Sequence, residues 1–328
     1  MSGLETTTRW LDKETTTLDK ADAIMRSVHA DENNPNGTSY LNWLITPSFE
    51  KKKTESFAGN VISYQIYKFS FYQVPQGSTI DDNLTPYSGW VLAYEANQKV
   101  HYIINRNTYS KLILRKMLKY TGRNELIQEM TRVYGDLFVW LISKVYTQNN
   151  TIEKTDDNLS DIVVDEIRGF KGRTEDSLNT VSAEGPSVMN ILSTLSFLVE
   201  SQNLRQVTFD LRYSDLPSTE VMLSTSNTVA IDLNQYMANT NSIDETRAIA
   251  KVFLTFYLEI LPVIIQNYFG ELEAGNWGKD GCVNFLQKVA DALSEKVKMR
   301  IGDLKSNPDQ LVFNKLDQGE QEEETKDG

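Results

Sequence analysis

The sequence predicts an α+β protein with two lobes, each with a small antiparallel sheet, plus a C-terminal helical layer. Stretches rich in β-branched and aromatic residues, typical of strands, occur in both halves of the chain. Segments with apolar residues at helical spacing follow each set and fill the last third. At 328 residues the chain exceeds the size at which one core stops growing. The predicted parts are a polar, partly disordered N-terminal segment (1–40), an N-terminal α+β lobe (41–150), a C-terminal α+β lobe with a helical end (151–302) and an acidic disordered tail (303–328).

In the first lobe, "NVISYQIYKFSFYQV" (60–74) predicts a strand. Its apolar alternation changes phase near Lys68, which indicates a bulge or a bend. "GWVLAYEANQKVHYIINR" predicts a hairpin with Asn97 and Gln98 at its turn. Helices are predicted over 107–122 and 124–146, packed on this sheet, whereas within 1–40 only "LDKADAIMRSVH" favours a helix.

The pattern of strands and helices then starts again. "DIVVDEI" predicts a strand, residues 167–181 a hairpin, and "PSVMNILSTLSFLVE" a helix with Pro186 near its first position, where the missing N–H does no harm. "LRQVTFDLRY", "TEVML" and "TVAIDL" predict a strand meander. Helices over 244–269 and 280–301 complete the chain before the tail.

The most apolar stretch is residues 252–269. It contains Glu259 and Pro262 and is shorter than the roughly 20 clean apolar residues of a membrane span. We therefore expect a buried core helix, kinked near the proline, with part of it facing a second subunit. The one cysteine, Cys282, excludes an intramolecular disulfide, and the N-terminus lacks the apolar core of a signal peptide. These features predict a cytoplasmic protein.

Common catalytic and cofactor motifs are absent from the sequence. The two histidines, His29 and His101, lack the spacing of a zinc site, and no GxSxG, GxxxxGK[ST] or GxGxxG pattern occurs. No cofactor, metal or catalytic residue is predicted. One enzymatic alternative is a magnesium-dependent nuclease that uses the carboxylates near residues 161–171, although their spacing differs from the usual pattern of such enzymes. Its residues would be Asp161, Asp165, Glu166 and Lys171.

Charge is unevenly distributed along this acidic chain of net charge −12. Between Lys99 and Arg132 there are eight basic and two acidic residues, whereas the tail from residue 303 has eight acids and three lysines. Lys111, Arg115 and Lys119 are spaced to share one helix face, where like charges repel. The spacing predicts an anionic partner for these three side chains. It could be an acidic protein surface, such as the tail or another subunit, or the phosphates of a nucleic acid.

A second basic feature lies in "DEIRGFKGRTEDS". If residues 167–181 form a hairpin tip, Arg168, Lys171 and Arg173 project together and Phe170 is displayed between two glycines. The predicted helix start that follows would add free N–H groups, which attract anions. The alternative is an ordinary surface loop of mixed charge, since Asp165, Glu166, Glu175, Asp176 and Glu184 flank the basic residues.

Together these patterns favour a non-enzymatic component of an intracellular complex. We expect an adaptor or an oligomeric binding protein that binds partner proteins or further copies of itself, with DNA or RNA as a further ligand. A bacterial or phage-related antiviral defence system would suit such a protein.

Overall fold

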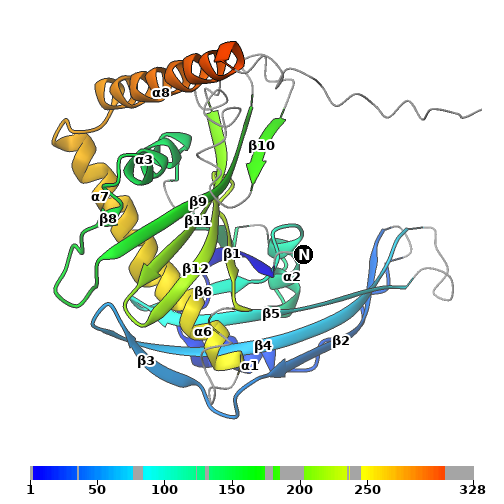
Figure 1. Ribbon diagram of the computed structural model, residues 1–328. Helices are drawn as coiled ribbons and strands as arrows, with labels where there is room; N and C mark the ends of the chain where they lie inside the picture. Colours follow the sequence, from blue (N-terminus) through cyan, green and yellow to red (C-terminus); the bar gives the residue numbers. More distant parts are fainter. Residues whose placement is uncertain are drawn as a thin grey trace, which may run out of the picture.

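The computed structural model describes residues 3–34, 37–76, 84–122, 124–129, 133–173, 180–184, 203–234, 236 and 245–306. These residues form the predicted α+β fold (Figure 1). The two expected small sheets are joined into one large sheet of 13 strands, in which all described pairs are antiparallel. The main path runs β10-β9-β11-β12-β13-β1-β6-β5-β4-β2, and β3, β7 and β8 pair with β4, β1 and β9.

The described strands are β1 (Leu4–Asp12), β2 (Ser39–Pro47), β3 (Lys53–Phe57), β4 (Asn60–Val74), β5 (Thr85–Ala96), β6 (Lys99–Ile104), β7 (Leu126–Gln128), β8 (Thr151–Ile152), β9 (Ile162–Arg173), β10 (Thr180–Glu184), β11 (Asn203–Tyr213), β12 (Leu216–Ser224) and β13 (Thr228–Asp232). The described helices are α1 (Leu18–Met25), α2 (Ser110–Met117), α3 (Gly135–Tyr146), α6 (Glu245–Thr255), the π-helical segment η2 (Phe256–Ile260), α7 (Leu261–Glu273) and α8 (Lys279–Ser306).

Strand β1 joins the two halves of the sheet. Its first part pairs with β13, and from Thr8 to Leu11 it pairs with β6. Thr7, Thr8 and Trp10 are buried there. The expectation of a polar, partly disordered start is therefore wrong for this stretch. Threonine is β-branched and favours strands, but three adjacent threonines beside charged residues look solvent-exposed until both neighbouring strands are known.

The phase change in β4 has a different cause from the predicted bulge. Strand β4 pairs with β5 without a register shift from Ser63 to Gln73. Before Lys68, Ile62, Tyr64 and Ile66 face one hydrophobic core, and after it Tyr67, Phe69 and Phe71 face a second core on the other side of the sheet. The strand thus remains regular while the face that is buried changes. The bulge lies instead in the neighbouring β2, between Leu41 and Leu44.

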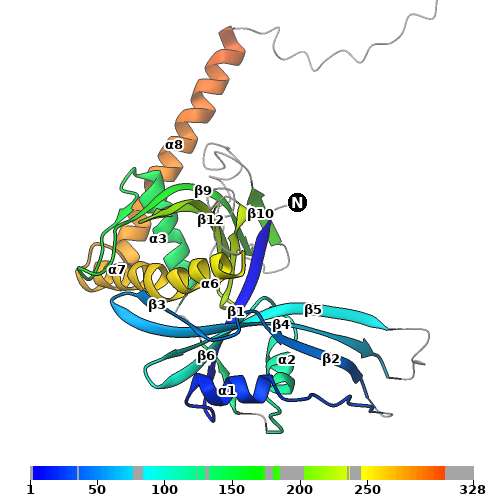
Figure 2. The same ribbon diagram turned by 90° about the horizontal axis from the view of Figure 1, so that it is seen from below.

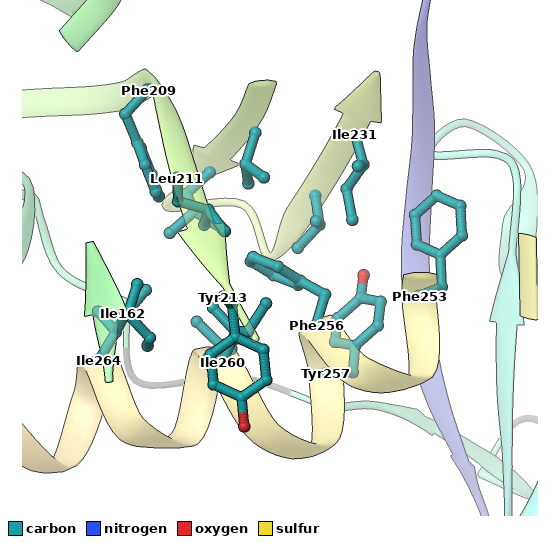
Figure 3. Close-up of a cluster of buried hydrophobic side chains, with 14 of the residues drawn as sticks. Ile162, Phe209, Leu211, Tyr213, Ile231, Phe253, Phe256, Tyr257, Ile260 and Ile264 are labelled. Atoms are coloured by element: carbon teal, nitrogen blue, oxygen red, sulfur yellow. The ribbon is translucent and has the colours of Figure 1, made fainter. Parts of the chain in front are cut away.

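The larger core is built around the continuous helix α6–η2–α7. Figure 3 shows Phe253, Phe256 and Ile260 of this helix directed toward the strands, with Phe209 and Leu211 of β11 among the residues they meet. By length and composition this helix could cross a membrane, with a hydropathy of 2.0 over its most apolar window, and 67% of that window is buried inside the chain. Burial of this kind is what the sequence predicts for a core helix.

The segment just before Pro262, near which a kink is predicted, is π-helical. Proline has no N–H, and its ring clashes with the carbonyl group four residues earlier in a regular α-helix. A wider π-helical turn accommodates that defect without ending the helix.

Helices α1 and α2 cover the opposite face of β4, β5 and β6 and form the second core with Trp10 of β1 (Figure 2). Helix α8 extends away from the rest of the protein, and Phe285 and Val289 are its buried side chains. The predicted positions of α1, of the β5–β6 hairpin and of the two C-terminal helices are confirmed. Asn97 and Gln98 form the hairpin turn at φ angles of 51° and 59°, a left-handed pair that this turn requires.

Two predicted helices are shorter than expected. Helix α2 ends at Met117 instead of reaching residue 122, and the helix predicted over 124–146 begins only at Gly135. Leu126–Gln128 is a strand on β1, since its backbone continues the ladder on the side of β13, beyond the last β13 pair at Thr8. The helix expected after Pro186 and the tail from residue 307 lie outside the described residues, and the division into domains stays a prediction.

Candidate functional site: a basic and aromatic pocket

A pocket of about 600 Å³ lies between α2, strand β2 and the segment that follows α1. This volume is in the range of small-molecule sites, roughly 300–1,000 Å³. The pocket combines three cationic side chains with one acid and two aromatic rings. Its lining residues are Val28, His29, Ala30, Glu32, Trp43, Leu112, Arg115, Lys116, Lys119, Tyr120 and Thr121.

The cations are placed by the way α2 ends. The N–H of Lys119 donates to the carbonyl of Lys116 at 3.1 Å, and the N–H of Tyr120 donates to that of Arg115 at 2.8 Å. This is a Schellman motif, in which the residue at the Lys119 position adopts the left-handed conformation usually taken by glycine. Lys119 does so at a φ of 57°. The turn directs the chain back along α2 and brings Lys119 to the same pocket as Arg115 and Lys116.

Each cation already has a partner inside the chain. Lys116 forms an ion pair with Glu32, and its Nζ lies 4.1 Å from the ring centroid of Tyr40. The Nζ of Lys119 donates to the carbonyl of Val28 at 2.9 Å. Arg115 is 3.9 Å from the carboxylate of Glu125, and its buried Nε has no hydrogen-bond acceptor. The Arg115 guanidinium is therefore only partly satisfied by the protein itself.

Trp43 forms the aromatic wall of the pocket, and a β-bulge positions it. Asn42 has a φ of 55° and donates its N–H to Asp31 at 2.6 Å. The extra residue shifts the register of β2 against β4, as bulges do when they redirect a side chain. The Trp43 ring stacks on Phe71 at 4.2 Å, and Phe71 stacks on Tyr87 at 5.3 Å. Trp43 thus belongs to a rigid stack of three rings.

His29 closes the pocket from the other side. Its Nδ1 lies 2.7 Å from the carbonyl oxygen of Ser27, and its Nε2 lies 2.8 Å from that of Met117 at the end of α2. These two contacts hold the imidazole ring in place against the end of α2.

The structure brings together two of the three residues in the predicted basic stripe. Arg115 and Lys119 line the pocket, whereas Lys111 does not. Lys116 was missed because the predicted stripe followed the i, i+4, i+8 spacing of Lys111, Arg115 and Lys119, which does not include it. Trp43 and His29 were also missed. No local pattern predicts them, since they come from segments far apart in the sequence.

The predicted hairpin is formed by β9 and β10, but the basic residues lie on its first strand and not at its tip. Arg168 to Arg173 belong to β9, and Arg173 pairs with Thr180 of β10. Phe170 has an exposed fraction of 2%, so the expectation that it is displayed is wrong. Its flanking glycines suggested a loop, but Gly169 and Gly172 both pair within the sheet.

Arg168 is held by carboxylates of the same protein. It pairs with Asp210 of β11 at 2.6 Å and with Glu166 at 3.2 Å. Lys171 is exposed on β9, and the side chain of Arg173 lies outside the described residues. The structure therefore does not gather Arg168, Lys171 and Arg173 with the pocket residues.

Two of the carboxylates of the predicted nuclease site each interact with a different group of the chain. Asp165 pairs with Arg212 at 2.7 Å, and Asp161 accepts the backbone N–H of Lys154 at 2.8 Å. Within the described ranges, no group of three or more His, Cys, Asp and Glu side chains is arranged to hold a metal ion. The nuclease hypothesis gains no support from this geometry.

A half-buried ionic cluster lies on the neighbouring strands β1 and β6, and it shares no residue with the pocket. Arg9 and His101 both contact the same carboxylate oxygen of Glu129 at 2.9 Å. Burial by itself raises the pKa of Glu129, but the hydrogen bond from His101 and the charge of Arg9 outweigh it, so the pKa is lowered. Burial also raises the pKa of Tyr257, whose ring Arg9 covers, to about 12. This cluster connects β1 and β6 to the π-helical segment and has a structural role.

Sequence comparison adds no functional assignment to this geometry. No protein-family model matches the chain, and no curated protein matches it significantly. The functional argument therefore depends on the pocket between α2, β2 and the segment after α1.

Proposed function

We propose that this protein is a non-enzymatic binding component of an intracellular complex, and that its pocket takes an anionic group of the ligand. The observation that carries the proposal is the meeting of Arg115, Lys116 and Lys119 in one cavity with a single lining carboxylate, Glu32. Cations gathered in this way repel one another, and a bound anion offsets that repulsion. The chain carries a net charge of −12, so the attraction has to be local.

The conformation of Lys119 supports a role for its charge. A non-glycine residue in the left-handed region costs roughly 1–2 kcal/mol, which a glycine at this position avoids. Residues held in such conformations occur preferentially at functional sites. The presence of lysine instead of glycine at this strained position is explained if the ammonium group of Lys119 contributes to binding.

Glu32 suggests how the pocket is kept stable without a ligand. Its carboxylate, paired with Lys116, occupies one of the three cations from within the chain. Arg115, whose nearest carboxylate (Glu125) is 3.9 Å away, and Lys119, which donates to a neutral carbonyl, are then the cations to which an entering anion binds. Phosphate suits this pair because arginine binds phosphate oxygens with two parallel hydrogen bonds.

The test is a salt series of binding to a single-stranded oligonucleotide and to polyphosphate. We expect binding that weakens with salt, and an Arg115→Ala/Lys119→Ala variant that binds more weakly and has a salt slope lower by about 0.7 for each lost phosphate contact. Lys111→Ala is the matched control, because Lys111 is on the same helix but does not line the pocket. Equal affinity and equal slope in the double variant and the wild type would remove the pocket from the proposal.

We also propose that the complex includes a second copy of this chain, bound through α8. The predicted interface in residues 252–269 is largely occupied by the core, whereas α8 exposes apolar side chains. Leu286, Ala290, Leu293, Val297 and Leu304 follow a coiled-coil heptad pattern, interrupted by Arg300. Lys296 and Asp303 share the same flanking heptad position, so an antiparallel pair of α8 helices places each against its opposite charge in the second copy.

A further inference from the structure

We infer that the anion taken by the pocket is the phosphate of a nucleotide, with the planar base held between the rings of Trp43 and His29. This inference rests on the proposed function, because it names the class of ligand for the same cavity. It adds a second recognition element, aromatic stacking, to the cations. The shared chemistry is a nucleoside phosphate, which a free nucleotide and the phosphorylated end of a single strand both present.

The ring geometry is the first argument. The centroids of His29 and Trp43 lie 6.4 Å apart with their planes tilted by 38°. By contrast, Trp43 and Phe71 are in stacking contact at 4.2 Å. A planar ring inserted between two others needs about 7 Å, twice the 3.4 Å spacing of stacked bases. The separation of His29 and Trp43 approaches that value, and the two ring planes have to turn from their 38° tilt toward parallel for a base to enter.

The rigidity of both rings is the second argument. Trp43 is supported on its other side by Phe71 and Tyr87, and His29 is fixed by the carbonyls of Ser27 and Met117. A site whose aromatic groups are already ordered loses little conformational entropy when a ligand stacks on them. Stacking depends on the π face that every base has, so little selectivity between bases is expected.

The pocket also has the charge and the size that such a ligand requires. Arg115 and Lys119 supply cations for a phosphate group, and the carboxylate nearest to the Arg115 Nε is 3.9 Å away, beyond hydrogen-bond distance. A cavity of about 600 Å³ holds a ligand of mononucleotide size. The hydroxyl of Thr121 lies on the same lining and is a candidate for a sugar or phosphate contact.

Calorimetric titration of the full chain with adenosine 5′-monophosphate, ribose 5-phosphate, inorganic phosphate and a 5′-phosphorylated pentanucleotide tests the inference. Stacking of one base is worth about 1–3 kcal/mol. We therefore expect adenosine monophosphate to bind roughly 5-fold to 150-fold more tightly than ribose 5-phosphate. Binding of the pentanucleotide but not of the monophosphate would identify a strand end as the source of the same group, and the reverse would identify a free nucleotide.

Substitution of Trp43 separates stacking from charge. Trp43→Ala should abolish the advantage of adenosine monophosphate over ribose 5-phosphate, Trp43→Phe should keep most of it, and neither should change the affinity for inorganic phosphate. If the wild type binds adenosine monophosphate and ribose 5-phosphate equally, the inference is wrong while anion binding stands. If the wild type binds no phosphate, nucleotide or polyanion, the proposed function fails as well. This comparison of ligands on the wild type does not depend on whether Trp43→Ala folds.

Discussion

Lys119 combines backbone strain with charge at a single residue. Lys119→Ala and Lys119→Gly remove the same ammonium group and the same bond to Val28. Only glycine relieves the left-handed φ of 57°. We expect the glycine variant to be more stable than the alanine variant by about 0.5–1 kcal/mol, after allowing for the greater freedom of glycine in the unfolded chain.

The two Lys119 variants should nevertheless bind phosphate ligands with equal affinity, weaker than that of the wild type. Urea unfolding gives the stability difference, and the titrations described above give the affinities. Equal stability of the two variants would contradict the strained turn. Wild-type affinity in both variants would show that the lysine is there for its contact with Val28 alone.

Glu129 provides a prediction about pH. Its pKa in the folded protein is lowered from the usual 4.5, so the carboxylate stabilises the fold above that pH and loses this contribution as pH falls through the lowered value. Glu129→Gln removes the ion pair with the half-buried Arg9, which keeps its hydrogen bond to the carbonyl of Tyr257, and should cost about 1–3 kcal/mol at pH 7.

The difference in unfolding free energy between the wild type and Glu129→Gln should be constant above about pH 5 and shrink as the pH falls below 4.5. Urea midpoints measured from pH 7 to pH 3.5 test this. Glu50→Gln, at an exposed position, serves as the control and should show little difference at any pH. A constant difference for Glu129→Gln down to pH 3.5 would contradict the lowered pKa.

At the scale of elements, α8 has a stripe of apolar side chains that the single chain leaves partly exposed. Val297 and Ile301 have exposed fractions of 40% and 46%, although both belong to a helix that is regular to Ser306. An apolar stripe of this kind favours pairing with another helix. The antiparallel pairing of Lys296 with Asp303 favours a second copy as the partner.

Light scattering at increasing concentration should therefore give a mass approaching twice the 37.4 kDa of one chain. Val297→Asp should return the protein to a monomer, because it places a charge in the apolar stripe. Met299→Asp introduces the same side chain on the outer face, where Met299 is 68% exposed, and should leave the dimer intact. A wild type that remains a monomer at all concentrations would exclude this interface.

At the scale of the whole molecule, β1 decides whether the sheet is continuous. Thr8 pairs with Thr228 of β13 on one side and with Ile104 of β6 on the other. Proline in the middle of a sheet removes a ladder hydrogen bond and leaves its acceptor unpaired, which costs about 1–3 kcal/mol. Thr8→Pro should therefore lower the melting temperature strongly, with loss of near-ultraviolet circular dichroism from both cores.

Lys53→Pro is the matched control for Thr8→Pro. Lys53 is exposed and is the first residue of β3, where proline is tolerated. We expect a small change in melting temperature there. If Thr8→Pro and Lys53→Pro lowered the melting temperature equally, the central position of β1 would be contradicted.

Prediction from the sequence succeeded where the signal is local. The β5–β6 turn at Asn97 and Gln98 and the helices in the last third all follow from residue types and spacing within one segment. Prediction failed where distant pairing decides the outcome. Leu126–Gln128 belongs to a segment whose apolar residues have helical spacing, but it forms a strand. The unpaired edge of β1 offers its backbone hydrogen-bond partners, and this tertiary pairing overrides the local helix propensity.

The candidate site shows the same division. The basic stripe pointed to Arg115 and Lys119 because their spacing is visible on one helix. Phe170 was misplaced because glycines on either side suggested a loop, whereas it lies on β9, pairs with Val207 of β11 and belongs to the core. The cytoplasmic location and the part in antiviral defence stay predictions.

By itself, the sequence determined the α+β class, the position of most helices and the segregation of positive charge around α2, since these depend on interactions between neighbouring residues. Only the tertiary structure decided that β1 joins the sheet, that Phe170 is buried, and that Trp43 and His29 meet Arg115 and Lys119 in one pocket. The physical reason is that the pocket is formed by side chains from segments that come together only when the core folds. The spacing of residues along the sequence does not indicate which distant segments will be in contact.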